Sequence, residues 1–320
     1  MTINKSELRR KSVFSLSAFV AVAGGAGLML AAGVAGASIA TTKHNLGTSG
    51  NGIATNTFSG TGEICVFCHT PHGADTGAPV PIWNRHLTPG AGYLTYDQLG
   101  TSTLDAQVLS VGSVSLACLS CHDGTQAMNV MINQPGSGGW FPPNGSALGG
   151  SWTGPASSDG KLSYASVVYI GTDLRNDHPV GMQFCGGGTK PGASAPTGEC
   201  KDDSFYSHLG APPPALNQKQ QNGKTVFWVD TEMSYDQTFP GGKGSLATDT
   251  GKAGNGVRNK TDLMLYTRTL PGSSLEEPFV ECATCHDPHS SNVTFLRVPN
   301  NKIGNPIVTG SALCLSCHEK

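Results

Sequence analysis

The chain has 320 residues, a formal net charge of −2 and only 13% charged residues. The small net charge gives no electrostatic case for nucleic-acid binding, and the low charge content excludes a charged disordered tail. With 43 glycines and 20 prolines, the composition does not suit a helical bundle or a coiled coil. Ten cysteines and ten histidines are the unusual part of this composition.

The first 40 residues have the pattern of an export signal. Basic residues occupy its start, residues 13–36 are apolar or small, and small side chains precede Thr41. This pattern predicts a signal peptide over residues 1–40, so that the mature protein is exported to a compartment where disulfides form. An uncleaved membrane anchor is the alternative, because the apolar stretch is long enough to span a bilayer.

Four C-x-x-C pairs follow, and a histidine comes directly after each of them. The motifs are Cys65-Val-Phe-Cys68-His69, Cys118-Leu-Ser-Cys121-His122, Cys282-Ala-Thr-Cys285-His286 and Cys314-Leu-Ser-Cys317-His318. On one helical turn two such thiols share a face, so both can add to the vinyl groups of one haem. The next histidine then stands under the iron as its proximal ligand. C-x-x-C-H is the attachment signature of c-type haem, so we expect four covalent haems.

Two other uses of C-x-x-C pairs fit these motifs less well. A zinc ribbon takes four thiolates from two pairs but does not need a histidine after every pair. A thioredoxin-like dithiol needs one pair beside a βαβ pattern, and no such pattern is visible. The spacing therefore favours haem over both.

Six histidines remain to serve as distal ligands, and they decide between electron transfer and catalysis. An iron with two histidine ligands is closed to substrate, whereas an open distal face suits catalysis. Six are enough to close four irons, which favours two imidazoles on each. The predicted distal ligands are His44, His72, His178 and His289. His86 and His208 are reserves, and Met182 is a weaker axial candidate.

An internal repeat supports two of these ligands. Motifs one and three both continue as C-x-x-C-H-x-P-H, ending in His72 and His289, and motifs two and four share Cys-Leu-Ser-Cys-His. The proline stops the motif helix, so the following histidine turns toward a neighbouring haem. In the simplest ligand assignment, His72 binds the haem of motif two and His289 binds that of motif four. His44 and His178 then serve motifs one and three.

The segments between the motifs complete the expected organisation. Residues 41–135 form an N-terminal dihaem segment, residues 136–275 a Gly/Pro/aromatic-rich insertion without haem, and residues 276–320 a C-terminal dihaem segment. Strand-like runs occupy residues 164–170, 225–230, 263–267 and 293–298. Cys185 and Cys200 lie in the insertion without a following histidine, and in an exported chain we expect them to form a disulfide rather than stay free.

The expected fold class is a multihaem cytochrome c that is mostly coil, with short helices at the CxxCH motifs and a few short β-strands in the insertion. Four large apolar haems replace much of a side-chain core, so little regular structure is needed.

The sequence resembles a known family. The residues that carry the resemblance are Lys43–Leu46, Ile64–His72, Pro81–Arg85, Asp177–Val180 and Cys314–His318. They resemble exported multihaem cytochromes with doubled CxxCH motifs, and in particular the OmcE-type tetrahaem cytochromes that polymerise into extracellular nanowires. The resemblance implies bis-histidine haems in a continuous row that runs between subunits. It also implies that a histidine can cross the subunit boundary, for which His44 is the expected donor.

These observations favour an electron-transfer protein rather than an enzyme. It acts at the cell surface or outside the cell, with redox cytochromes or extracellular acceptors as partners and other copies of itself in a filament. A soluble periplasmic carrier is the first alternative. A multihaem oxyanion reductase and a membrane-anchored quinol dehydrogenase subunit are less favoured, because no modified motif marks one haem as catalytic.

Overall fold

The computed structural model describes residues 39–136, 138–155, 159–187, 200–202, 204–205, 216–229, 231, 258, 261–298 and 313–318. These belong to one unit, Ser38–Lys320. The predicted signal peptide lies almost wholly outside the described residues. Among the described residues no helix is long and apolar enough to cross a membrane.

Short helices form at all four motifs, as the sequence predicts. Motif two is the α-helix α2 (Ser115–His122), and motif three begins with α4 (Cys282–Cys285). Motifs one and four are 3-10 turns, η3 (Cys65–Phe67) and η8 (Cys314–Ser316). Further 3-10 turns are η1 (Ile39–Thr41), η2 (Thr48–Gly50), η4 (Gly90–Gly92), η5 (Tyr96–Leu99), η6 (Phe184–Gly186) and η7 (Val293–Phe295).

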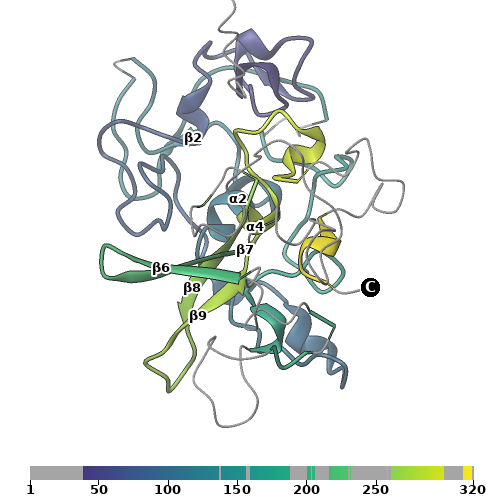
Figure 1. Cartoon of the computed structure of the whole chain (residues 1–320). Helices are drawn as coiled ribbons and strands as arrows, with labels where there is room; N and C mark the ends of the chain where they lie inside the picture. Colours follow the sequence, from purple (N-terminus) through teal and green to yellow (C-terminus); the bar gives the residue numbers. More distant parts are fainter. Residues whose placement is uncertain are drawn as a thin grey trace, which may run out of the picture. The chain divides into compact units, whose positions relative to one another are not determined.

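A small antiparallel sheet supports these motifs. Its strand order is β5-β9-β8-β7-β6, and Figure 1 labels β6 to β9. The strands are β5 (Met182–Gln183), β6 (Leu216–Gln221), β7 (Lys224–Val229), β8 (Leu263–Thr269) and β9 (Glu276–Val280). Two short pairs lie elsewhere: β1 (Thr57–Phe58) with β4 (Trp152–Thr153), and β2 (Val130–Met131) with β3 (Ser146–Ala147). The remaining described chain is mostly turns and coil, in agreement with the expected fold class.

The β6–β7 hairpin forms because its turn has the residues that a two-residue connection requires. Asn222 and Gly223 join the strands, and both have positive φ (52° and 74°). A type I′ turn needs positive φ at both positions, which Asn-Gly tolerates best. The hairpin thus brings the apolar side of β7, with Phe227 and Val229, into a core that also contains the sheet residues Leu263 and Leu265.

The sheet also sets where His178 lies. β5 pairs with β9 in the antiparallel register Met182↔Val280. In an antiparallel pair the residues before one strand run beside those after the other. The chain that precedes β5, with His178, therefore runs beside the chain that follows β9, which is motif three.

Two of the four strand-like runs are strands and two are not. Residues 225–230 and 263–267 correspond to β7 and β8. The prediction for 164–170 is wrong: this run forms turns, in which Ser166 and Tyr169 each donate their N–H three residues back. The prediction for 293–298 is also wrong, because Thr294 and Phe295 have positive φ (54° and 59°), which β-strands do not accommodate.

Cys185 and Cys200 form a disulfide, which confirms the predicted pairing. Both half-cystines are buried in the core described above, and Cys317 of motif four packs against the same core. The disulfide therefore ties the insertion to the neighbourhood of the fourth motif.

Candidate functional site

The four motifs come together in chain order. Cys68 of motif one interacts electrostatically with Cys121 of motif two, and Cys118 of motif two with Cys282 of motif three. Cys285 of motif three interacts in the same way with Cys314 and Cys317 of motif four. The motifs thus lie near one another in succession, one to two, two to three and three to four.

A buried carboxylate joins motifs two and three. The Ser115 hydroxyl, at the start of α2, donates a hydrogen bond to Glu281 Oε2 (2.5 Å), and Arg268 Nη1 lies 3.2 Å from Oε1. Glu281 also caps α4, because its side chain accepts from the Thr284 backbone while its own N–H donates to the Thr284 hydroxyl. Cys282 N donates to the Ser115 hydroxyl (3.1 Å) and closes the link. These bonds fix the first turns of the two helices against each other.

This carboxylate gives a pH dependence to stability. Burial raises the pKa of Glu281 from 4.5 to about 7, although Ser115 and Arg268 act to lower it. The folded chain holds the proton more tightly than the unfolded chain does. The stabilisation by protonated Glu281 is therefore complete below pH 4.5, and it is lost as the pH rises through about 7.

Glu281→Gln is expected to remove about 3 kcal/mol of that pH dependence. The measurement is guanidinium unfolding of the haem-loaded protein at pH 4.5 and pH 7.5, with variant Glu63→Gln, which changes an exposed carboxylate, as control. Identical pH dependence in Glu281→Gln and the unmodified protein would contradict the prediction.

Three proximal histidines are held by a backbone carbonyl. His69 Nδ1 bonds Pro81 O (3.1 Å), His122 Nδ1 bonds Val168 O (2.9 Å) and His286 Nδ1 bonds Thr294 O (2.8 Å). A carbonyl oxygen only accepts, so Nδ1 carries the proton in each ring and Nε2 keeps its lone pair. This is the tautomer and orientation that a metal-bound imidazole needs.

The segments that supply these carbonyls repeat between motifs one and three. Trp83 forms a β-bridge with His69, and Leu296 forms one with His286. The residue before each, Ile82 or Phe295, has positive φ (51° and 59°). Such backbone strain in non-glycine residues gathers at functional sites. The repeat seen in the C-x-x-C-H-x-P-H sequences therefore extends to a segment that the sequence comparison did not find.

Motifs two and four take the corresponding contacts from the insertion. Val168 O binds His122, and Ile170 N–H donates to the His122 carbonyl (2.9 Å). Phe205 forms a β-bridge with His318, and their rings lie 4.2 Å apart. The insertion thus builds part of the sites of two motifs, which sequence spacing did not reveal because the partners are far apart along the chain.

Large apolar side chains stand exposed beside the proximal histidines. Val167 is 99% exposed next to the carbonyl that binds His122, and Val293 is 78% exposed next to the carbonyl that binds His286. Ile82 is likewise exposed next to the His69 contact. An apolar macrocycle bound at each imidazole would cover such side chains, so the residues present fit haem.

Three proximal histidines face a second histidine. Ring centroids are 6.2 Å apart for His69 and His289, 6.3 Å for His122 and His44, and 6.3 Å for His286 and His178. A metal–imidazole bond of about 2 Å, with the ring centroid about 1.1 Å beyond the nitrogen, puts two opposed axial rings about 6.2 Å apart. All three separations match this value.

The structure changes the wiring that the sequence favoured. His289 lies beside His69 of motif one, not beside motif four, and His44 lies beside His122 of motif two. His178 lies beside motif three, where spacing put it. His72 is exposed and faces no described histidine ring, and only its backbone carbonyl is engaged, by Thr70 and Asn133. His208 lies outside the described residues, and His86 is partly buried.

Burial favours the neutral form of three imidazoles, those of His44, His69 and His286. It lowers the pKa of His44 to about 4, with a further lowering from His122, whereas a hydrogen bond to the Pro288 backbone raises it. Burial also lowers the pKa of His69 and of His286. Neutral imidazole is the form that binds iron. Burial raises the pKa of Cys285 to about 11, which keeps its free thiol protonated.

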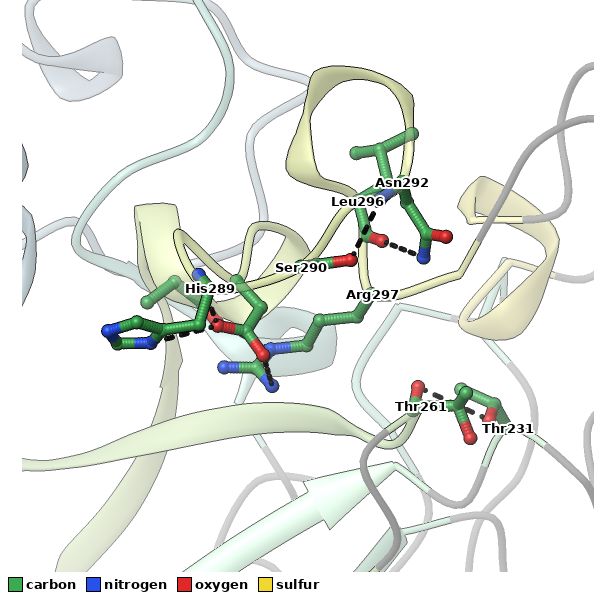
Figure 2. A network of polar contacts seen from close by, with 9 residues as sticks. Thr231, Thr261, His289, Ser290, Asn292, Leu296 and Arg297 are labelled. Carbon is green, nitrogen blue, oxygen red and sulfur yellow. Dashed lines mark hydrogen bonds and ion pairs between the residues drawn. The ribbon is translucent and has the colours of Figure 1, made fainter. Parts of the chain in front are cut away.

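A polar network surrounds the end of motif three (Figure 2). Asp287 Oδ1 lies 3.4 Å from His289 Nδ1 and also accepts the His289 backbone N–H (3.0 Å). Arg297 Nη1 lies 3.9 Å from Asp287 Oδ2. Asn292 donates to the Leu296 carbonyl (2.7 Å) and holds the adjoining turn. Among the described residues no group of three or more His, Cys, Asp or Glu side chains is placed to hold a bare metal ion.

Comparison with known families gives one match. The doubled CXXCH motif family matches residues 277–320, which contain motifs three and four. No curated protein matches the chain. The doubled motif supports a multihaem c-type cytochrome with covalently bound haem c, and it suggests electron transfer.

Proposed function

We propose that this chain is a tetrahaem c-type cytochrome whose irons each carry two imidazoles and which transfers electrons without catalysing a reaction on a substrate. The observation that supports it best is the separation of 6.2–6.3 Å in three histidine pairs. Each pair joins a CxxCH histidine to one outside the motif.

The pairs give a specific ligand assignment. His69 and His289 hold the haem of motif one, His122 and His44 that of motif two, and His286 and His178 that of motif three. His318 is the proximal ligand of the fourth. Its distal ligand is His208 or His72, and His208 follows Phe205, the residue against His318, by three positions.

Electron transfer is what such sites can do. When bound, each haem supplies one iron that takes one electron from a reduced redox partner and gives it to the next oxidised iron or acceptor. Two imidazoles leave the iron no free coordination position, so an oxyanion or other substrate does not reach it. The contacts between successive motifs support a route from motif one to motif four.

Haem content and spin state test the proposal. We expect a pyridine haemochrome assay to give four haems per chain and electron paramagnetic resonance to show only low-spin ferric haem. Fewer than four haems, or a high-spin haem that binds nitrite and turns it over, would overturn it in favour of another cofactor or a reductase.

For location, we propose export to the cell surface or beyond, with filament formation between copies of the chain. One observation favours filaments: His72 occupies the place in motif one that His289 occupies in motif three, yet it is exposed. It is therefore available to a neighbouring copy, whereas His44, the expected donor, already faces His122 of its own chain. Electron microscopy of the secreted protein should show regular fibres. A monomer at high concentration would instead favour a soluble periplasmic carrier.

A further inference from the structure

The distal histidine of motif one has a partner of a different kind from the other described axial histidines. Its Nδ1 faces the Asp287 carboxylate at 3.4 Å (Figure 2). The local sequence Asp287-Pro288-His289 holds this carboxylate in place, because the same Oδ1 accepts the His289 backbone N–H. An aspartate that accepts the N–H two residues later is a common local turn.

The comparable contacts in the described part of the chain are to neutral carbonyls. They are Pro81 O for His69, Val168 O for His122, Thr294 O for His286 and the Pro288 backbone for His44. Among the other axial histidines, His178 also has a carboxyl group nearby, because the Asp177 carboxyl interacts with it electrostatically. No ion pair joins these two groups, however, so the Asp287–His289 contact is distinct among the described axial histidines.

A carboxylate that accepts the Nδ1–H of an imidazole makes it a stronger donor to a metal. Asp287 Oδ1 lies within ion-pair distance of that nitrogen in His289. A stronger axial donor and a nearby negative charge both stabilise ferric over ferrous iron, and second-shell hydrogen bonds are among the determinants of haem potential. Arg297 stands 3.9 Å from the outer oxygen of Asp287 and bonds the Ala283 carbonyl through Nε, so it holds the carboxylate without displacing it from His289.

Resting on the ligand pairs of the proposed function, we propose that Asp287 is a positioning residue that lowers the reduction potential of the haem at motif one through His289. The carboxylate belongs to the sequence of motif three but acts on the haem of motif one. When bound, this haem would take up an electron less readily than it would with a neutral partner on His289.

The chain itself offers a matched substitution. Motif one has Thr70 where motif three has Asp287, in otherwise equivalent H-x-P-H sequences. The Thr70 hydroxyl donates a hydrogen bond to the His72 carbonyl. The test compares Asp287→Asn and Asp287→Thr with Asp287→Glu and with Asp177→Asn. Each haem-loaded variant is titrated potentiometrically while low-spin signals are followed by electron paramagnetic resonance. The motif-one signal is the one lost in His289→Ala.

We expect Asp287→Asn and Asp287→Thr to shift the ferric-to-ferrous ratio of that haem about tenfold toward ferrous at a fixed potential, which is about 59 mV for one electron. Its resonance g-values should change as well, because the ligand field changes and not only the surrounding charge. Asp287→Glu should restore most of both effects, and Asp177→Asn should leave this haem unchanged.

An unchanged potential and unchanged g-values in a fully loaded, low-spin Asp287→Asn variant would overturn the proposal and leave the proposed function intact. Loss of haem or of low-spin character in the unmodified protein would instead overturn the proposed function. Should Asp287→Asn fail to fold, Asp287→Thr, which copies motif one, carries the same test.

Discussion

Replacing His289 with alanine is expected to convert the haem at motif one from low-spin to high-spin while the other haems stay low-spin. The reason is the 6.2 Å separation of the His69 and His289 rings, which leaves His289 as the group available on the far side of that iron. About a quarter of the haem absorption should therefore change. The open position should bind cyanide, and added imidazole should restore the low-spin spectrum.

The control for this variant is His86→Ala. His86 is a partly buried histidine for which no contact with another histidine ring is found in the described part of the chain. All four haems of that variant should remain low-spin. A fully low-spin spectrum from His289→Ala would contradict the assignment. A high-spin haem at motif four rather than motif one would instead support the wiring that the sequence spacing favoured.

The features that the sequence predicted correctly depend on short stretches of chain. A C-x-x-C-H segment forms one helical turn because its two cysteines and histidine need only local backbone bonds, and all four motifs do so. Strands β7 and β8 likewise correspond to the strand-like runs at residues 225–230 and 263–267. The Cys185–Cys200 disulfide joins the two cysteines that no CxxCH motif uses, and 15 positions separate them.

The histidine pairs could not be predicted because they depend on contacts between distant segments of the chain. His178 reaches motif three through the register of β5 with β9, and that register depends on the packing of the sheet. His289 reaches motif one although 220 positions separate it from His69. Proline after the motif predicts that the following histidine turns away from its own motif, but it does not indicate which other motif that histidine meets.

The insertion was also misjudged by a purely local reading. Its run at residues 164–170 is apolar and β-branched, which is typical of a strand. In the structure the Val168 carbonyl accepts a hydrogen bond from His122, and the neighbouring Val167 side chain is exposed. Side chains that pack against a haem instead of a sheet have the same composition as strand residues. Composition alone therefore does not separate the two.

Arg85→Met is expected to destabilise the protein by about 3–5 kcal/mol, because Arg85 is fully buried and binds five acceptors. Its guanidinium donates to the Ser120 hydroxyl and carbonyl and to the carbonyls of Ala127, Met128 and Val130 (2.8–3.2 Å). No carboxylate of the described residues pairs with it. Methionine fills a similar volume but supplies no donor to these acceptors.

The Ser120 carbonyl lies in the last turn of α2, so Arg85 fastens the segment after motif one to the helix of motif two. Loss of this link should loosen both sites, and guanidinium unfolding of the haem-loaded protein measures it. Arg85→Lys, with three donors, should fall between Arg85→Met and the unmodified protein. The control is Arg175→Gln, which removes a partly exposed arginine paired with Asp173 and should cost much less stability than Arg85→Met. Equal stability of Arg85→Met and Arg175→Gln would show that the five hydrogen bonds do not hold the two motifs together.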